Sequence, residues 1–74
     1  MTDTVAALGE QALLEGFRLA GASIYVAETD DEVHSAWMAL PGNAVVVFLT
    51  PRAAAALGAL LADSHSPMTV VLPS

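Results

Sequence analysis

The sequence contains no cysteine, and only two of its 74 residues are basic. The absence of cysteine excludes a disulfide framework and every cysteine-based metal cluster. The two histidines, His34 and His65, are 31 positions apart and have no histidine neighbour, so they do not make a metal cluster either. Stability must therefore come from burial of apolar side chains, within the chain or against a partner.

Positive charge is scarce as well. The chain has two basic residues against eight acidic ones, which gives a net charge of −6. A surface of this sign repels the phosphates of nucleic acids and the head groups of anionic lipids. We therefore expect no nucleic-acid partner.

The sequence has no uninterrupted apolar run long enough to span a membrane. Residues 44–62 are largely apolar, but Thr50-Pro51-Arg52 places a helix stop and a charge in their middle. An arginine at the centre of a bilayer costs roughly 2.5–3.5 kcal/mol on the insertion scale. The first residues also lack the basic and apolar regions of a secretion signal. We expect a cytoplasmic chain without direct membrane insertion.

Nucleotide-binding motifs are missing too. Neither GxGxxG nor GxxxxGK[ST] occurs, so the backbone cradle for nucleotide phosphates is absent. A phosphoacceptor domain needs an aspartate at the end of its third strand, and Thr50 stands there instead. We expect no cofactor.

Two groups of polar residues remain as candidate sites. Asp30 and His34 are four apart on an expected helix, but two ligands are too few for a metal. Asp63 to Ser66 contains the residue types of a hydrolase triad, but as chain neighbours, which indicates a solvated loop. The sequence therefore predicts no catalytic, cofactor-binding or metal residue, and no enzyme.

Apolar residues are abundant: they make up 55% of the chain, and the mean hydropathy is +0.62. Both values are high for a chain whose surface must stay wettable. The length allows a single domain, residues 1–74, close to the smallest size that folds unaided. We infer that part of its surface is hidden in a complex.

The most secure element is a helix over about residues 30–40. Thr29 is suited to cap it, and Glu32 is placed to reach back to the amide of Thr29 in a capping box. The turn signal Pro41-Gly42-Asn43 ends it. Its apolar stripe consists of Val33, Ala36, Trp37 and Leu40. Trp37 is most simply a core residue, with a partner-facing position as the alternative.

Further strands and helices follow the same logic. Residues 44–49 are continuously apolar and β-branched, as in a central strand covered on both faces. Thr50 and Pro51 then begin a helix through about Ala62. We expect the helix to face inward through Leu57, Leu60 and Leu61, and we expect two more strands over residues 23–27 and 68–72.

The N-terminal third has two interpretations. Residues 5–19 could form one helix, but Gly9 and Gly16 would each cost about 1 kcal/mol inside it. A strand over residues 4–8, a turn at Gly9 and a helix over 10–20 ending at Gly21 accommodates Gly9 better. In that helix we expect the sheet-facing side chains to be Leu13, Leu14 and Phe17. Strands then alternate with helices along the chain, which predicts a parallel sheet with right-handed crossovers.

One part of this pattern is specific. Leu8-Gly9-Glu10 is followed by the run Gly16 to Gly21, GFRLAG. The chain resembles the F-subunit family of the V-type and A-type rotary ATPases, which has a strand ending in Ile/Val-Gly-Asp and a helix ending in Gly-Phe-x-Leu-Ala-Gly. The remaining elements also resemble that family, down to a fourth strand that ends in proline, here Pro73. The chain departs from the family in having Glu10 in place of aspartate and in lacking a C-terminal helical extension after Ser74.

The resemblance implies a non-catalytic component of the central rotor stalk of a proton- or sodium-translocating ATPase. In that family the domain packs against the coiled-coil subunit of the stalk and helps to couple ATP turnover to rotation. The fold expected is α/β: a small, open, four-stranded parallel sheet of the doubly wound, Rossmann-like type, ordered 2-1-3-4, with three helices. Such a protein would be peripheral to the membrane through the ATPase complex.

A sheet of that order has one face with a single helix, because the right-handed crossovers place the other two helices on the opposite face. We therefore expect alternate residues of the third and fourth strands to meet water and to bind a partner. The residues chosen for this partner-binding role are Val45, Val47, Leu49, Val70, Leu72 and the basic residue Arg18. The partner is the stalk coiled coil or a second copy of the chain, and the alternative function is a freestanding oligomeric α/β interaction module.

Overall fold

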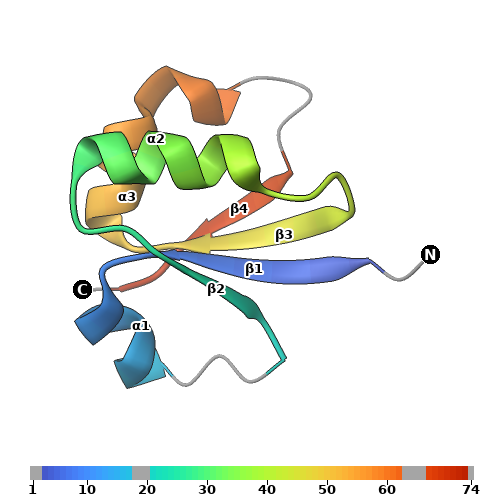
Figure 1. Ribbon diagram of the computed structural model, residues 1–74, viewed down its shortest axis with the longest axis horizontal. Coiled ribbons are helices and arrows are strands. Elements are labelled where there is room, and N and C mark those ends of the chain that lie inside the picture. Colours follow the sequence, from blue (N-terminus) through green and yellow to red (C-terminus); the bar gives the residue numbers. More distant parts are fainter. Residues whose placement is uncertain (1–2, 18–20, 63–66, 74) are drawn as a thin grey trace.

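Helices and strands alternate along the chain, as the sequence predicts. The computed structural model describes residues 3–17, 21–62 and 67–73, apart from the side chain of residue 17. The elements are β1 (Thr4–Gly9), α1 (Gln11–Phe17), β2 (Ser23–Val26), α2 (Asp30–Ala39), β3 (Ala44–Leu49), α3 (Pro51–Leu57), the 3-10 helix η1 (Gly58–Ala62) and β4 (Met68–Val71) (Figure 1). The N-terminal third is therefore strand then helix.

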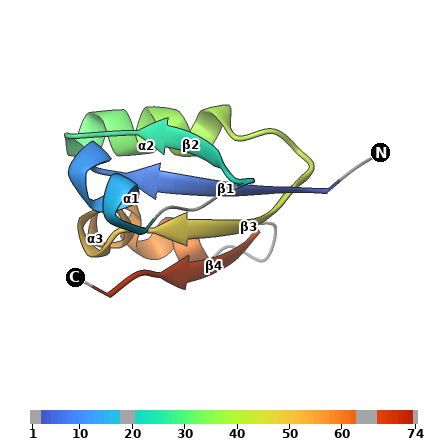
Figure 2. The ribbon, with the colours of Figure 1, turned by 90° about the horizontal axis from the view of Figure 1, so that it is seen from below.

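The strands form one parallel sheet in the order β2-β1-β3-β4, which confirms the predicted α/β fold. Helix α1 lies on one face of this sheet, and α2 and α3 lie on the other (Figures 1 and 2). Right-handed crossovers produce this division, since the chain passes from β1 to β2 in one direction and then back past β1 to β3. No helix of the described residues is long and apolar enough to cross a membrane.

The larger core lies between the sheet and the α2–α3 layer. Its fully buried strand residues include Leu8, Val47 and Leu49, and its helix residues include Val33 and Leu57. Trp37 packs against this core with part of its surface exposed, which agrees with its interpretation as a core residue. A smaller core on the α1 side contains Ala7, Leu14 and Leu72, with Phe48 packed beside them.

One helix ends earlier than expected. The α-helical part that begins at Pro51 stops at Leu57, because Gly58 adopts φ +49° and the chain continues as the 3-10 helix η1. A 3-10 helix has three residues per turn, so its side chains rotate away from the stripe of an α-helix. Leu61 still packs against the larger core, but Leu60 is 43% exposed, so its predicted inward position is wrong.

Three of the predicted partner-binding residues are buried inside the fold. Val47 and Leu49 are fully buried beneath α2 and α3, and Leu72 is buried with Leu14 on the α1 side. The expectation that they meet water is wrong, because the two-helix layer covers one alternate set of β3, and Leu14 of α1 packs with Leu72, which follows β4. Arg18 lies outside the described residues.

Val45 owes its exposure to an irregularity in the sheet. The pairing of β1 with β3 runs Thr4 to Ala44 and then Val5 to Val46, so Val45 has no partner residue in β1. An extra residue of this kind bends a strand locally and removes one side chain from the regular alternation. Val45 is accordingly 42% exposed although both of its chain neighbours are more buried.

Candidate functional site

Doubly wound sheets bind ligands at the carboxyl ends of their strands, where the order of strands reverses. In this chain that place lies between β1 and β3, next to the residues that follow these strands and β2. The local residues are Gly9, Glu10, Glu28 and Thr50. They decide whether the crevice is open to a ligand.

Thr50 fills the crevice beside β1. Its side chain is fully buried and lies so close to Gly9 that a Cβ at residue 9 would overlap with both Oγ1 and Cγ2 of Thr50. Gly9 also has φ +154°, a conformation that other residues rarely adopt. Glycine is therefore required at position 9 for two reasons, the backbone angle and the close approach of Thr50.

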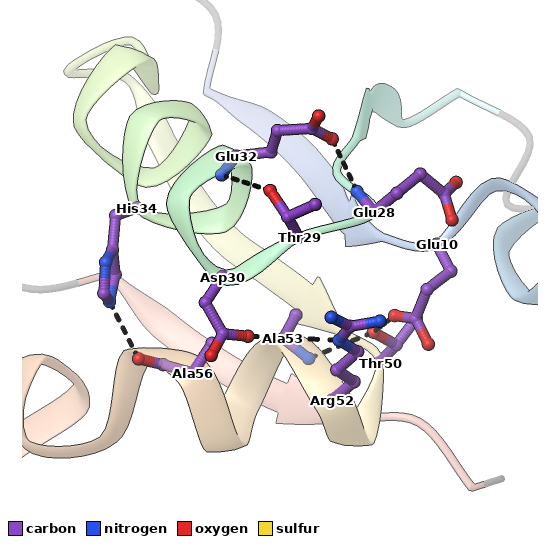
Figure 3. A network of polar contacts seen from close by, with 10 residues as sticks. All are labelled: Glu10, Glu28, Thr29, Asp30, Glu32, His34, Thr50, Arg52, Ala53 and Ala56. Carbon is purple, nitrogen blue, oxygen red and sulfur yellow. Dashed lines mark hydrogen bonds and ion pairs between the residues drawn. The ribbon is translucent and has the colours of Figure 1, made fainter.

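Hydrogen bonds hold Thr50 in this position (Figure 3). Its hydroxyl donates to Oε1 of Glu10 at 2.5 Å and accepts from the backbone N–H of Ala53 at 3.3 Å, so it also caps α3. Its backbone N–H donates to the carbonyl of Leu8 at 3.2 Å. Thr50 thus links the ends of β1 and β3 to the start of α3.

The start of α1 is occupied by a side chain of the protein itself. The backbone N–H of Gln11 donates to a carboxylate oxygen of Glu28 at 2.9 Å. The backbone of the same loop is tied down, since Ala27 N–H donates to the carbonyl of Gly9 at 2.8 Å. An anionic ligand would have to displace Glu28 and approach a second carboxylate, Glu10.

The start of α2 carries the predicted cap in a modified form. Thr29 Oγ1 accepts from the N–H of Glu32 at 3.1 Å, as the capping box predicts. Glu32 Oε1 accepts from the N–H of Glu28 at 2.7 Å and not from Thr29 (Figure 3). The carboxylate therefore satisfies the amide one residue earlier than expected, and ties the end of the β2 loop to α2.

The Asp30–His34 pair does not converge on a common point. Nε2 of His34 lies 2.8 Å from the carbonyl oxygen of Ala56, so this nitrogen donates across to α3, whereas Asp30 faces the guanidinium of Arg52 at 3.9 Å (Figure 3). In the part of the chain that the structure describes, no three His, Cys, Asp or Glu residues are placed to hold a metal. Asp63, Ser64, His65 and Ser66, the other group considered, lie outside that part.

The chemistry available at the carboxyl edge is limited. The Thr50 hydroxyl beside the Glu10 carboxylate has the residue types of a nucleophile and a base. However, Thr50 has no exposed surface, so a substrate cannot contact its hydroxyl without opening the fold. We conclude that the Thr50–Glu10 pair packs the protein at the switch point, which is the place between β1 and β3 where the order of strands reverses.

The second candidate site is an apolar surface on the α1 side of the sheet. The register of the sheet places Ile24 beside Ala7, and Val70 beside Phe48, on this same face. Helix α1 lies over the carboxyl end of the face, and no other helix of the described residues covers it (Figure 2). We define the α1-side patch by four residues and their exposed fractions: Ile24 (48%), Val26 (47%), Met68 (68%) and Val70 (40%).

Sequence reasoning found part of this patch. Val70 belongs to it, whereas Ile24, Val26 and Met68 were not chosen. The run over residues 23–27 indicates these positions, because it has apolar residues at both odd and even positions, so apolar side chains lie on both faces of the sheet. Among the described residues no helix after α1 lies on the α1 side to cover them. The bare face was expected over the third and fourth strands, and it extends to β2 as well.

Comparison of the chain with protein-family models and with curated protein sequences found no match. The likeness to the F-subunit family therefore rests on the residues quoted for it and on the arrangement of the elements.

Proposed function

We propose that this chain is a non-catalytic component of the central rotor stalk of a V-type or A-type ATPase, similar to the F-subunit family. It acts by binding the coiled-coil stalk subunit through the α1-side patch. In this role it takes part in ATP-driven proton or sodium transport, or in ATP synthesis, from the cytoplasmic side.

The observation that carries the proposal is the exposure of the patch. A four-stranded parallel sheet is normally covered on both faces. Among the described residues, one face has a single helix, α1 (Gln11–Phe17), and apolar side chains of both edge strands are exposed by two-fifths or more. Apolar surface of this kind on a small domain marks a protein interface. A helix of a coiled coil presents the complementary shape and apolar stripe.

The closed switch point supports the non-catalytic part of the proposal. Thr50 fills the place beside Gly9, and Glu28 occupies the first amide of α1. Glycine is needed there for close packing of the protein on itself, which gives the Gly9-Glu10 pair of the resemblance a structural role. The sheet order 2-1-3-4 also agrees with the fold that the resemblance implies.

The test is binding to the coiled-coil stalk subunit encoded in the same genome, measured by calorimetry with the full chain. Ile24→Asp places a charge in the patch at an exposed position, so we expect at least a tenfold loss of affinity, because a buried unpaired charge must be desolvated. The matched control is Val71→Asp. Val71 is also exposed (51%) and also lies on an edge strand, but its register with Leu49 places it on the opposite face.

The proposal fails if the wild-type chain does not bind the stalk subunit at concentrations up to about 100 μM, a free energy of roughly −5.5 kcal/mol. Equal losses of affinity for Ile24→Asp and Val71→Asp would leave the stalk function standing but contradict the assignment of the face.

A freestanding oligomeric α/β interaction module is the second candidate. It is favoured by a separate observation, the uncharged edge strand β4 with exposed Met68, Val70 and Val71. Purification as a stable symmetric oligomer without affinity for the stalk coiled coil would support it over the first.

A further inference from the structure

Strand β4 forms one edge of the sheet, and its outer side has no strand beside it among the described residues (Figure 2). Its four residues carry no charge, and Met68, Val70 and Val71 expose apolar side chains on both faces of the sheet. Natural edge strands are usually protected by charges, prolines or bulges, because free backbone groups recruit a further strand. The hydrogen-bonding groups at this edge are therefore of interest.

One hydrogen bond identifies which backbone groups point outward. The N–H of Leu72 donates to the carbonyl of Leu49 at 2.8 Å, so Leu72 points toward β3. Successive residues of a strand direct their N–H and C=O groups to opposite sides. It follows that the N–H and C=O groups of Val70 also point toward β3, and that those of Thr69 and Val71 point outward, away from the sheet.

Prolines limit the edge to these two residues. Every second residue directs its backbone groups outward, so Pro67 precedes Thr69 in this set and Pro73 follows Val71. Proline has no N–H, and within sheets it is tolerated where that group would face away from the neighbouring strand. Within residues 67–73 the outward donors are thus Thr69 and Val71, in a segment centred on Val70.

We propose that two copies of the chain pair through β4, antiparallel and about a two-fold axis at Val70. In this register Thr69 of each copy lies opposite Val71 of the other, and each such pair exchanges two hydrogen bonds. All outward N–H and C=O groups of the two residues are then satisfied in both copies. The next opposed pair is Pro67 with Pro73, which has no N–H, so the prolines end the ladder on both sides.

A second copy fits this edge because the set of donors and acceptors is self-complementary, as a two-fold interface requires. Charge favours β4 over the other edge strand. Glu28 follows β2 almost directly, and three more acidic residues stand at the start of α2, so pairing through β2 would bring these segments of two chains of charge −6 together. Strand β4 has no charged residue, and its pairing joins the four-stranded sheets with these acidic segments at the far edges.

The dimer goes beyond the proposed stalk function, and a different set of variants tests it. Sedimentation equilibrium of the full chain over a wide concentration range should show a monomer–dimer equilibrium. Val71→Pro removes one outward N–H per copy, hence two of the four hydrogen bonds, and should weaken the dimer about tenfold or more. The matched control is Val26→Pro. The N–H of Ala27 points to β1, so the N–H of Val26 points outward at the other edge of the sheet, on β2. This substitution should leave the dimer unchanged.

A thiol at the axis gives a second readout that does not depend on how proline is tolerated. The chain has no cysteine, so Val70→Cys provides a single thiol. At the two-fold axis the two copies of residue 70 face each other as a non-hydrogen-bonded antiparallel pair, whose Cα atoms lie about 4.5 Å apart. This distance is within the range that a disulfide bridges. Val70→Cys should become a covalent dimer under mild oxidation. Ile24→Cys, on the same face and more exposed (48% against 40%), should form dimers at least about tenfold more slowly.

A chain that stays monomeric at all concentrations overturns the dimer, whatever its affinity for a stalk protein. A dimer that cross-links equally fast through Ile24→Cys, or that dissociates with Val26→Pro and not with Val71→Pro, overturns the assignment to β4. A dimer that is weakened by Val71→Pro and trapped by Val70→Cys establishes it.

Discussion

At the scale of single residues, Gly9 and Thr50 decide whether the edge of the sheet can bind a ligand. Thr50 uses its whole side chain inside the protein: the hydroxyl bridges Glu10 and the start of α3, and the methyl group packs over Gly9. The sequence identified Gly9 as a turn after the first strand and Thr50 as a helix cap. It did not predict their contact, because they are 41 positions apart and meet only when β1 and β3 pair.

We predict that Gly9→Ala destabilises the fold by roughly 3 kcal/mol, from overpacking against Thr50 and from backbone strain at a positive φ. Urea unfolding measures this. In a Thr50→Ala background the cost should be smaller, since the two closest atoms are then removed. Gly16→Ala is the control, because a Cβ at Gly16 meets nothing within 4 Å and alanine favours the helix by up to about 1 kcal/mol. Equal effects of the two substitutions would contradict the close packing at Gly9.

At the scale of elements, the sequence predicted the bounds of a helix or strand well wherever both of its ends carry a cap or turn signal. The strand Ala44–Leu49 was predicted with its observed bounds, and the helix from Asp30 to within one residue of its end. Both have strong chain signals at their ends, a cap on one side and a turn on the other. The helix from Pro51 was extended too far because leucines continue past Gly58, whereas the α-helix ends at Gly58, which adopts a positive φ as C-cap.

The cap of α2 leads to a prediction about this element. Thr29→Ala removes the hydrogen bond from the N–H of Glu32 and should lower the free energy of unfolding by about 1 kcal/mol. Thr29→Ser keeps the hydroxyl and should retain most of the stability. Thermal unfolding of both variants followed by circular dichroism makes the comparison, and a serine variant as unstable as the alanine variant would show that the methyl group and not the cap is responsible.

At the scale of the whole molecule, the arrangement of helices decides which side chains are available to a partner. The resemblance implies the sheet order 2-1-3-4 and, with it, a face with a single helix, and the part of the chain that the structure describes has both. The sequence did not predict which alternate set of β3 is covered, because Val45, Val46 and Val47 are chemically alike and the register shift at Val45 leaves no local signal. Val47 and Leu49 were therefore assigned to the wrong face, and Ile24 and Met68 were missed.

We predict that the same substitution on the two faces of the sheet lowers the free energy of unfolding by different amounts. Val47 is fully buried in the larger core, so Val47→Ala should lower the free energy of unfolding by roughly 2 kcal/mol through lost burial and a cavity. Val26→Ala makes the same chemical change at a residue that is 47% exposed in the α1-side patch, where we expect a loss of under about 1 kcal/mol. Urea unfolding at one low protein concentration compares them. Similar losses would mean that the α1 side is covered in the isolated chain, and the patch could then not serve as the surface for a stalk helix.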